Sequence, residues 1–433
     1  MSEKNYNIGD VEIKDVILTN FSGTSIDITK LFTNMYIQED IFAPVTVGEI
    51  SLIDKDALME KLPIIGNETI SMTYRTYKSF DWVTRSFYVY AITNQHKLND
   101  NAITFSLNFA TKEYLLSNSM KLSKSFNNMS PCAIVNSILK NTLGSTKDSN
   151  IEESMGIMNY IAPNLTPIQV ISVMCSRAKS KLNPGGASYM FYEDVKGFNF
   201  KTLEGLYKTK PFNYIAAVST LSNEYTLDTM FTVLGVHFDT GVSAASSVST
   251  GALGVKAFSL DLYNKKLKDV SYNHNDDKQY TKMNRVTGQD PSYKCVPNDF
   301  AFKSEVGLKK FFISPSSVDS ASFKDENTSV RYSQMASIAT GPKVSLEVVF
   351  NSKLTVGSMI NLKVMTAKGS DSSTEVDMED AFNSGLYLVT CCRHIFKSFG
   401  GRAYATTALE LSRDTYNNSH DELVKKNNKG IGL

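Results

Sequence analysis

The chain has 433 residues, of which 42% are hydrophobic and 21% charged, and this is enough for two or three domains with a sizeable core. Its 45 basic and 44 acidic side chains leave a net charge of +1, which argues against a dedicated nucleic-acid binder, because such a protein needs a basic face. The sequence holds no apolar run of about 18 residues and no signal-peptide core, so we expect no stable membrane association and folding in a reducing cytoplasm.

The first part of the chain, residues 10–125, is typical of an antiparallel β-domain. Ile103, Phe105 and Leu107 alternate with polar side chains, which is the pattern of a strand with one face in a core. Asn and Asp at 99–101 supply the turn before it, since both tolerate the backbone angles of a tight turn. The predicted strands are Glu49–Asp54, Thr69–Thr76, Ser86–Gln95 and Ala102–Ala110.

A mixed α/β module is expected over residues 126–215. A Ser-Pro pair at 130–131 predicts the start of a helix, because serine caps helices and proline favours the first helical position. A Thr-Pro pair at 166–167 predicts a second helix, and Gln169 completes a capping box. Two strands, SYMFYED and KGFNFKTL, follow around a turn at 195–197.

The rest of the chain divides into three segments. Residues 216–340 contain the small-residue stretch VSAASSVSTGALG and then a polar, weakly patterned region, so we expect a Ser-rich linker and an irregular insertion that contributes in part to a second β-domain. One helix is predicted there, at 326–339. The second β-domain covers 341–415, and the polar tail 416–433 is expected to be disordered. The predicted strands of the second domain are Val344–Phe350, Met359–Met365, Gly385–His394 and Ala403–Leu411.

The two β-regions are similar in the order and length of their segments. EISLID, LPIIGNETISMTY, FYVYAITNQH and NAITFSLNFA in the first match VSLEVVF, LTVGSMINLKV, LYLVTCCRH and AYATTALELS in the second. Gly66 and Gly357 precede the second strand of each set, and His96 and His394 lie late in the third. We interpret this as an internal duplication, which would dictate the architecture. The alignment sets TNQ against CCR, so the strand needs no cysteine there for its structure.

The stretch CCRH, residues 391–394, is the first candidate for chemistry. Side chains alternate along a strand, so Cys392 and His394 would share one face, and Cys391 and Arg393 the other. At most two of them could bind one metal, whereas a structural zinc site needs four ligands, and the chain has no C-x-x-C pair. A Cys–His nucleophile needs a third, orienting group, which neighbours on one strand rarely provide. We therefore expect ordinary strand cysteines.

Other candidates for chemistry are weaker. The remaining cysteines and the isolated histidines considered are Cys132, Cys175, Cys295, His237 and His274. We expect the first two cysteines on helix faces and Cys295 in a polar loop, and we expect surface or satisfied histidines rather than catalysts at the two His positions. Glu193 and Asp194 could be the paired acids of a lysozyme-like hydrolase, but their place between a strand and a turn favours turn residues. With no serine-hydrolase, P-loop or zinc-protease motif, we expect no catalytic, cofactor-binding or metal residues and no enzyme.

An acidic run, EVDMEDAFNSG, covers residues 375–385. Its four acids, Glu375, Asp377, Glu379 and Asp380, do not have the alternating spacing of a calcium loop. We expect a solvated loop, and the other possibility left open is a contact surface for a partner protein.

Three pieces of the sequence carry a resemblance to a known family. They are MYIQEDIFAPVTVGEISLID with LPIIGNETISMTYRT, then SYMFYEDVKGFNFKTLEGL, and finally VGSMINLKV with YLVTCCRHIFKSFGGRAYATTALELSR. Their order over residues 35–415 resembles the central baseplate hub proteins of contractile-tailed, T-even-like phages, which are related to the base of type VI secretion spikes. The Ser-rich segment 242–335 and the acidic hairpin 367–385 depart from this pattern.

The resemblance implies a β-rich α+β fold, in which two similar tail-tube-like antiparallel β-barrel domains hold a mixed α/β insertion between them. It implies a homotrimer, because three copies of two similar domains give six positions that match a six-fold tail tube. Its partners would be the tail tube or tube-initiator protein, the central spike protein and the baseplate wedge proteins. The protein would be a structural part of the virion tail baseplate, assembled in the bacterial host cytoplasm, through which DNA passes on ejection without specific binding.

Other functions stay open from the sequence alone. One is another tail component, such as a tube initiator or the spike base of a secretion or tailocin machine. Less favoured are a cell-envelope hydrolase and a carbohydrate binder, and the single Trp argues mildly against the latter. The sequence assigns no partner-binding residues.

Overall fold

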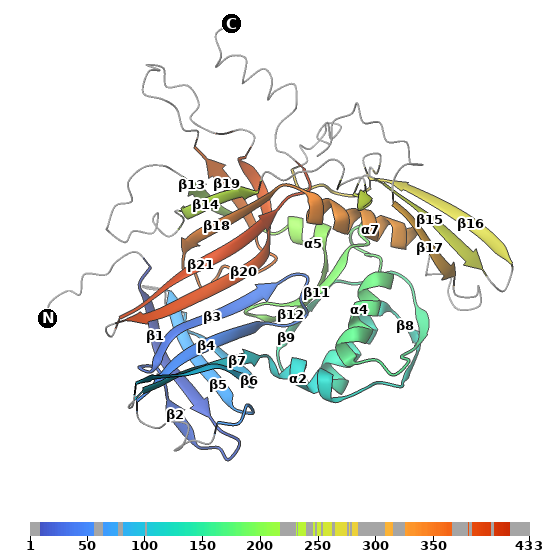
Figure 1. Cartoon of the computed structure of the whole chain (residues 1–433). Coiled ribbons are helices and arrows are strands. Elements are labelled where there is room, and N and C mark those ends of the chain that lie inside the picture. Colours follow the sequence, from blue (N-terminus) through green and yellow to red (C-terminus); the bar gives the residue numbers. More distant parts are fainter. Residues whose placement is uncertain are drawn as a thin grey trace, which may run out of the picture.

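Figure 1 shows a computed structural model of the chain, in which long curved strands are joined to a mixed helical part and to a separate hairpin. The structure describes residues 9–55, 64–76, 81–99, 102–216, 231, 233–239, 246, 249–252, 254–261, 265–274, 277, 279–284, 308–314, 325–365, 380, 383–399 and 402–415. Among these residues we find no helix with the length and apolar character needed to cross a membrane.

One sheet of 13 strands contains most of the described β-structure. Its main path is β14-β18-β21-β20-β3-β4-β7-β6-β5-β1-β2, and β19 pairs with both β20 and β13. Every pair is antiparallel except β13 with β19. The earlier strands are β1 (Val11–Thr19), β2 (Ser25–Asp27), β3 (Phe32–Asp40), β4 (Val47–Asp54), β5 (Thr69–Thr76), β6 (Val83–Asn99) and β7 (Ala102–Ala110). The later ones are β13 (Phe212–Ala216), β14 (Val233–Asp239), β18 (Lys343–Val349), β19 (Met359–Val364), β20 (Gly385–Phe399) and β21 (Arg402–Ser412).

The sheet confirms the predicted β-rich, antiparallel character, and alternation of side chains explains it. In β4 and β5 every second residue is buried, so each strand places one row of side chains in a core and the other outside. The predicted strands all lie within or nearly match observed ones, whereas five strands of this sheet were not predicted, namely β1, β2, β3, β13 and β14.

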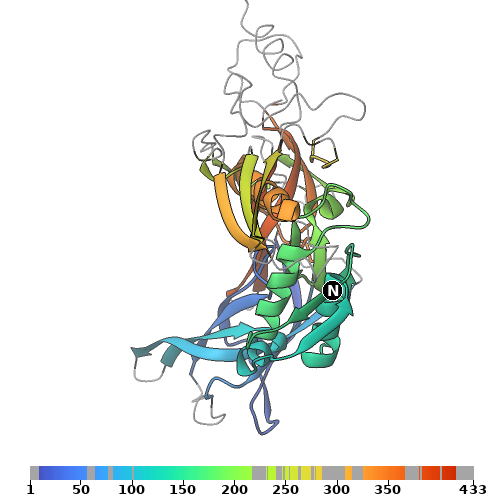
Figure 2. The same ribbon diagram turned by 90° about the vertical axis from the view of Figure 1, so that its right-hand side faces the viewer.

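The β20–β21 hairpin belongs to both β-regions. The start of β20 pairs with β19, while Cys391 to Lys397 pair with β3. The hairpin also reaches the residues just before β1, since the Ala405 amide donates to the Gly9 carbonyl at 2.7 Å. Phe396 packs against Tyr74 of β5, with 5.1 Å between ring centroids. The two β-regions therefore share strands and core, and in both views they stack directly on each other (Figure 2).

The two β-regions have the same strand order, as expected from the internal duplication inferred from the sequence. β4-β7-β6-β5 and β18-β21-β20-β19 have the same order and the same antiparallel pairs. Each third strand also carries a bulge, at Tyr90 in β6 and at Thr390 in β20. Matching the bulges aligns Ala91–Thr93 with Cys391–Arg393, so our residue alignment of this strand was wrong by two residues. Gly66 and Gly357 both have left-handed backbone, with φ of +90° and +77°.

The middle of the chain forms a module of short helices and strands. Its elements are α2 (Lys112–Ser119), β8 (Ser125–Met129), α3 (Pro131–Ser137), the π-helical turn η1 (Ile138–Thr142), β9 (Asp148–Ile151), β10 (Met158–Ile161), α4 (Pro167–Arg177), β11 (Tyr189–Glu193), β12 (Gly197–Thr202) and α5 (Leu203–Tyr207). The predicted caps are present: Ser130 accepts from the Ala133 amide, and Thr166 and Gln169 form a complete capping box.

The β11-β12-β9 sheet of this module faces two cores. Phe191, Phe198 and Phe200 lie in a cluster with buried residues of α3 and α4. Met190 and Tyr192, which point the other way, lie in the core of the second β-region. The module is thus fixed to the large sheet through one face of its own small sheet.

The segment that we expected to be irregular contains a three-stranded sheet of its own. β15 (Gly254–Asp261) pairs with β16 (Lys266–Asn273) and with β17 (Leu308–Ser314), and α7 (Asp325–Thr340) packs against β15 and β16. The alternation is weak because the buried side chains on β15 include small ones, such as Ala257. The helix predicted at 326–339 is confirmed.

Candidate functional site

The CCRH stretch lies in β20, with its side chains divided as the strand pattern predicted. Cys392 and His394 are both buried on one face, and the Cys392 thiol lies 3.6 Å from His394 Nε2. On the other face the Arg393 guanidinium lies over the Tyr36 ring at 4.7 Å and donates to Gln38. Cys391, also on that face, is half-buried.

Electrostatics disfavour nucleophilic chemistry at this pair. Burial raises the pKa of Cys392 well above its usual value, so the thiol stays protonated. Burial, together with the Arg85 charge, lowers the pKa of His394 to about 3, so the imidazole stays neutral. Its Nδ1 lies 2.9 Å from the Thr407 hydroxyl, which satisfies it within the core. The pair is an ordinary part of the core.

The other sequence candidates lie apart from one another. His237 is exposed on β14, while His274 is buried with its ring centroid 5.3 Å from that of Tyr280. Cys132 is half-buried and Cys175 buried on their helices. Within the described part of the chain no group of three or more His, Cys, Asp and Glu side chains could hold a metal ion. Cys295 and the acids Glu375, Asp377 and Glu379 lie outside the described residues.

Glu193 and Asp194 take different roles, so our prediction that both are turn residues was half wrong. Asp194 does form the turn, accepting from the amides of Lys196 and Gly197 at 2.8 and 2.9 Å. Glu193 is instead the last residue of β11 and is 3% exposed. It belongs to a chain of ionic and hydrogen-bonded groups that we call the junction network: Glu39, Thr46, Arg85, Glu113, Lys147, Glu193 and Thr355.

One half of the junction network joins the two β-regions. Arg85 of β6 donates to Glu39 of β3 at 2.6 Å and to the Thr46 hydroxyl at 3.0 Å. Both charged side chains are buried, with exposed fractions of 6% and 0%. The second oxygen of Glu39 accepts from the Thr355 hydroxyl at 2.5 Å, and Thr355 belongs to the loop before β19.

The other half reaches the middle module. The Thr46 amide donates to Glu193 at 3.0 Å, and the Lys147 ammonium lies 2.6 Å from Glu193 and 2.9 Å from Glu113. Burial raises the pKa of Glu193, although Lys147 and Arg85 oppose this. Burial also acts against the charged form of Glu113, but the Lys147 charge and the hydrogen bonds from Ser145 and Lys147 together lower the pKa of that carboxyl. The network therefore connects three parts of the chain through charges that are costly to separate.

Sequence analysis missed the junction network, although a signal was present. In β6 the inward residues are Arg85, Phe87 and Val89, so a charge occupies a position in an apolar row. In β3 Glu39 continues the inward row of Met35 and Ile37. A charged residue in the buried phase of a strand needs a partner, and two such strands indicate a pair.

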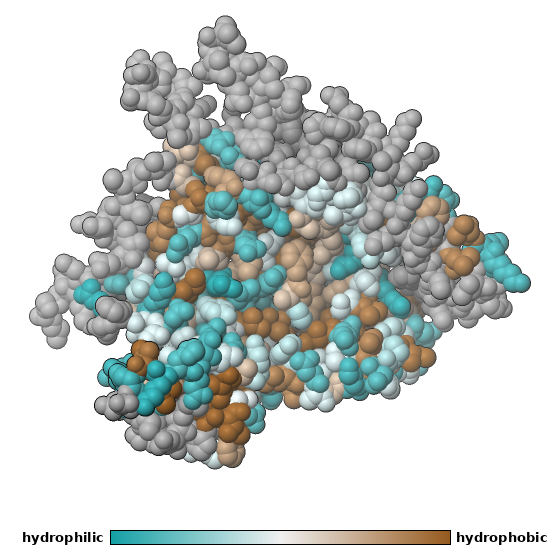
Figure 3. Space-filling view, in the orientation of Figure 1, coloured by the Kyte–Doolittle hydropathy of each residue, from teal (hydrophilic) through white to brown (hydrophobic). Residues whose placement is uncertain are grey.

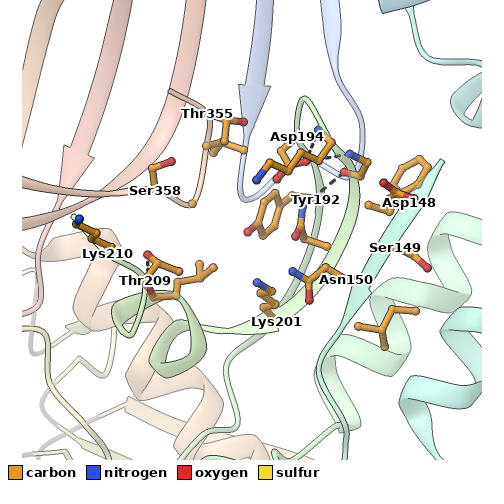
Figure 4. Close-up of a pocket in the computed structure, with 18 of the residues that line it drawn as sticks. Asp148, Ser149, Asn150, Tyr192, Asp194, Lys201, Thr209, Lys210, Thr355 and Ser358 are labelled. Carbon is orange, nitrogen blue, oxygen red and sulfur yellow. Dashed lines mark hydrogen bonds between the residues drawn. The ribbon is translucent and has the colours of Figure 1, made fainter. Parts of the chain in front are cut away.

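A polar cavity of about 530 Å³ lies beside the junction network. Its floor is the small sheet, where Tyr192, Asn199 and Asn150 are cross-strand neighbours on β11, β12 and β9. The loop Thr355–Ser358 forms one wall, and the chain after α5, including Lys210, forms another (Figure 4). Because Thr355 is bonded to Glu39, the network also fixes this wall.

Exposed apolar residues are interspersed with hydrophilic ones on the face shown in Figure 3. The largest exposed fractions include Ile161 of β10 at 72% and Leu267 of β16 at 67%. Leu267 pairs in register with Leu260, which is 39% exposed, so the hairpin presents an apolar pair to its surroundings.

Comparison with known proteins identifies a class of fold. No sequence-family description and no curated protein matches the chain. The structure is similar to a tail protein from Neisseria meningitidis, with a TM-score of 0.53 and 9% identity over 92% of this chain and 96% of that one. It is also similar to the 43 kDa tail protein of prophage MuSo2 from Shewanella oneidensis, with a TM-score of 0.53 and 8% identity over 92% and 98%.

A type VI secretion component from E. coli has a TM-score of 0.44 at 10% identity, over 93% of this chain and 76% of that one. This similarity is too weak to establish a shared fold. The first two likenesses show that the chain shares its fold with these two tail proteins. At such identities the likeness concerns the fold alone, and at that level it agrees with the resemblance noted in the sequence.

Proposed function

We propose that the protein is a structural baseplate hub, a trimeric ring that adapts the six-fold tail tube to the three-fold central spike. The observation that carries this proposal is the duplicated strand order, β4-β7-β6-β5 and β18-β21-β20-β19, within one chain. Three chains with two such sets present six similar strand sets in a closed ring, and each set would curl into a tube-like barrel.

The way in which the two sets are joined supports a mechanical role. They share the β20–β21 hairpin, and the junction network links them to the middle module through buried charges. A ring built from such units transmits force as a rigid body, because packed interiors resist deformation. Sheath contraction would drive the ring and the spike forward as one unit. DNA would then pass through the opening of the ring once the spike leaves.

The partners follow from this geometry. The tail tube or its initiator would bind one side of the ring and the central spike the other, with baseplate wedge proteins at the periphery. The protein would lie in the virion tail after assembly in the host cytoplasm. Likeness to two tail proteins over 92% of the chain supports this placement.

We infer that the protein is not a cell-envelope hydrolase. Glu193, the best acid candidate, is buried and paired with Lys147 at 2.6 Å, while Asp194 is bonded to its own turn. Zymography on peptidoglycan should show no clearing with the wild-type chain. Clearing that disappears in Glu193→Gln but persists in Glu153→Gln, a surface acid, would contradict this inference.

The mass of the protein in solution tests the proposed ring. Three chains of 48.0 kDa give 144 kDa, and we expect sedimentation velocity to find this mass for the chain alone or co-expressed with neighbouring tail proteins. A mass of 48.0 kDa in both samples would contradict the hub.

A further inference from the structure

A tyrosine hydroxyl of the small sheet faces the polar cavity. The Tyr192 side chain is only 2% exposed, and its hydroxyl points into the cavity in Figure 4. We find no hydrogen bond from this hydroxyl to another described residue, and it lies beside Gly357, where an added Cβ would come within 2.5 Å of it. Because this hydroxyl borders the open space of the cavity, it can donate to an acceptor that enters there.

The cavity also has an excess of available positive charge. Lys196, Lys201 and Lys210 line it, and none of them forms an ion pair with a described residue. Burial lowers the pKa of Lys201, which an anionic partner would reverse. Of the two lining acids, Asp194 is already bonded to two amides of its turn and Asp148 is exposed.

The shape of the cavity favours an extended peptide over a compact anion. Its volume of about 530 Å³ exceeds that of a single carboxylate or phosphate, and the lysines come from different walls. On the floor, Asn199 and Asn150 continue the row that begins at Tyr192, and amide side chains both donate to and accept from a peptide backbone. Several carboxylates spaced along a chain would match this arrangement.

We propose that the cavity binds the acidic segment 371–379 of a second copy of the chain, an inference that rests on the proposed ring. The segment, DSSTEVDME, has four acidic residues and no basic one, which complements the lysines. The next residue, Asp380, is anchored at the end of β19, where its amide donates to the Val364 carbonyl at 2.8 Å. The cavity lies at the other end of β19, near Ser358, and both edges of β19 are occupied by β13 and β20. Copies of the chain meet in the proposed ring, and for this reason the segment is assigned to a second copy.

Titration of a synthetic peptide tests the recognition itself. A labelled DSSTEVDME peptide is added to a chain whose own segment is neutralised by Asp371→Asn, Glu375→Gln, Asp377→Asn and Glu379→Gln. We expect saturable binding that weakens about tenfold with Lys201→Gln and Lys210→Gln together, and about threefold with Tyr192→Phe. The matched control, Lys179→Gln with Lys181→Gln, removes two charges from outside the cavity and should leave binding unchanged.

No saturable binding below about 1 mM would overturn the proposal, as would equal weakening in the control pair. Circular dichroism and melting temperature show whether each variant keeps its fold. Tyr192→Phe also separates the contribution of the hydroxyl from that of the aromatic side chain, because only the hydroxyl is lost.

A measurement of self-association tests whether the bound segment comes from a second copy. It also distinguishes this proposal from that of the trimeric ring. If the segment links copies, trimer formation should be weakened equally by neutralising the acids and by the pair Lys201→Gln and Lys210→Gln. Combining both sets of changes in one chain should weaken it no further. A trimer that is indifferent to both changes would overturn this inference and leave the ring standing. Failure of every sample to trimerise would overturn the ring, while the peptide titration would still decide recognition.

Discussion

At the scale of single residues, the most informative feature is a pair of charged side chains at inward-facing positions of two strands. Arg85 and Glu39 are 46 positions apart, and each takes an inward position that an apolar side chain would normally fill. A buried ion pair adds little stability compared with a well-packed apolar pair, but removing one member leaves an uncompensated charge. The pair therefore fixes how β3, β6 and the loop before β19 fit together.

Arg85→Met is expected to lower the free energy of unfolding by about 3–5 kcal/mol, because Glu39 would remain buried without a counter-charge. Arg75→Met is the matched control, since the Arg75–Glu12 pair is half-exposed at 27% and 30% and should cost less than about 1 kcal/mol. Urea unfolding of both variants measures the difference. Equal losses would show that the buried pair has no special role.

The buried histidine of β20 predicts a pH dependence of stability. His394 has its pKa lowered to about 3, whereas an unfolded histidine titrates near 6.5, so only the unfolded state takes up a proton between these values. Stability is therefore fully present above pH 6.5 and falls as the pH drops toward 3, by about 2 kcal/mol at pH 5 for this one group.

Replacing this histidine should remove that loss. The stability of His394→Gln is expected to change less between pH 7 and pH 5 than that of the wild type, whatever its absolute value. His237→Gln, at an exposed position, should keep the wild-type slope. Thermal unfolding across this pH range is the measurement, and an unchanged slope in His394→Gln would refute the assignment.

At the scale of elements, local rules predicted much of the fold. Strand alternation and the two capped helices were visible because each depends on neighbours within a few residues. β15 to β17 were missed because their strands lack a clear alternating row. The alignment of the duplicated strands erred by two residues because the bulges at Tyr90 and Thr390 leave no sequence signature.

The candidate site was less predictable than the fold. The faces of Cys392 and His394 followed from strand geometry, yet their inert, buried surroundings depend on Thr407 and Arg85 from other strands. The polar cavity is formed by three segments distant in sequence, so no local pattern could indicate it.

Close packing between strands predicts the effect of one glycine substitution. Gly48 of β4 lies between β3 and β7, and a Cβ there would lie 2.3 Å from the Tyr36 carbonyl and 2.5 Å from the Phe109 ring. Gly48→Ala should therefore cost about 1–3 kcal/mol through overpacking. Gly235→Ala in β14 is the control, because its Cβ would meet the nearest atom at 3.8 Å. Chemical denaturation compares the two, and equal stability of both variants would contradict the packing.

At the scale of the whole molecule, two strand sets of the same order are held together as one body. The β20–β21 hairpin pairs with strands of both sets, and Phe350, Phe396 and Ala405 of the second set lie in the core of the first. A subunit with this internal repeat can present two similar surfaces in fixed relation, which is what a three-fold ring needs to match a six-fold tube.

The measurement that tests this claim most directly is negative-stain electron microscopy of the purified chain, with class averages of end-on views. We expect a ring with a central opening and six similar lobes related by three-fold symmetry. Averages that show a compact particle without an opening, or a ring whose lobes do not number six, in samples with and without the neighbouring tail proteins would contradict the account.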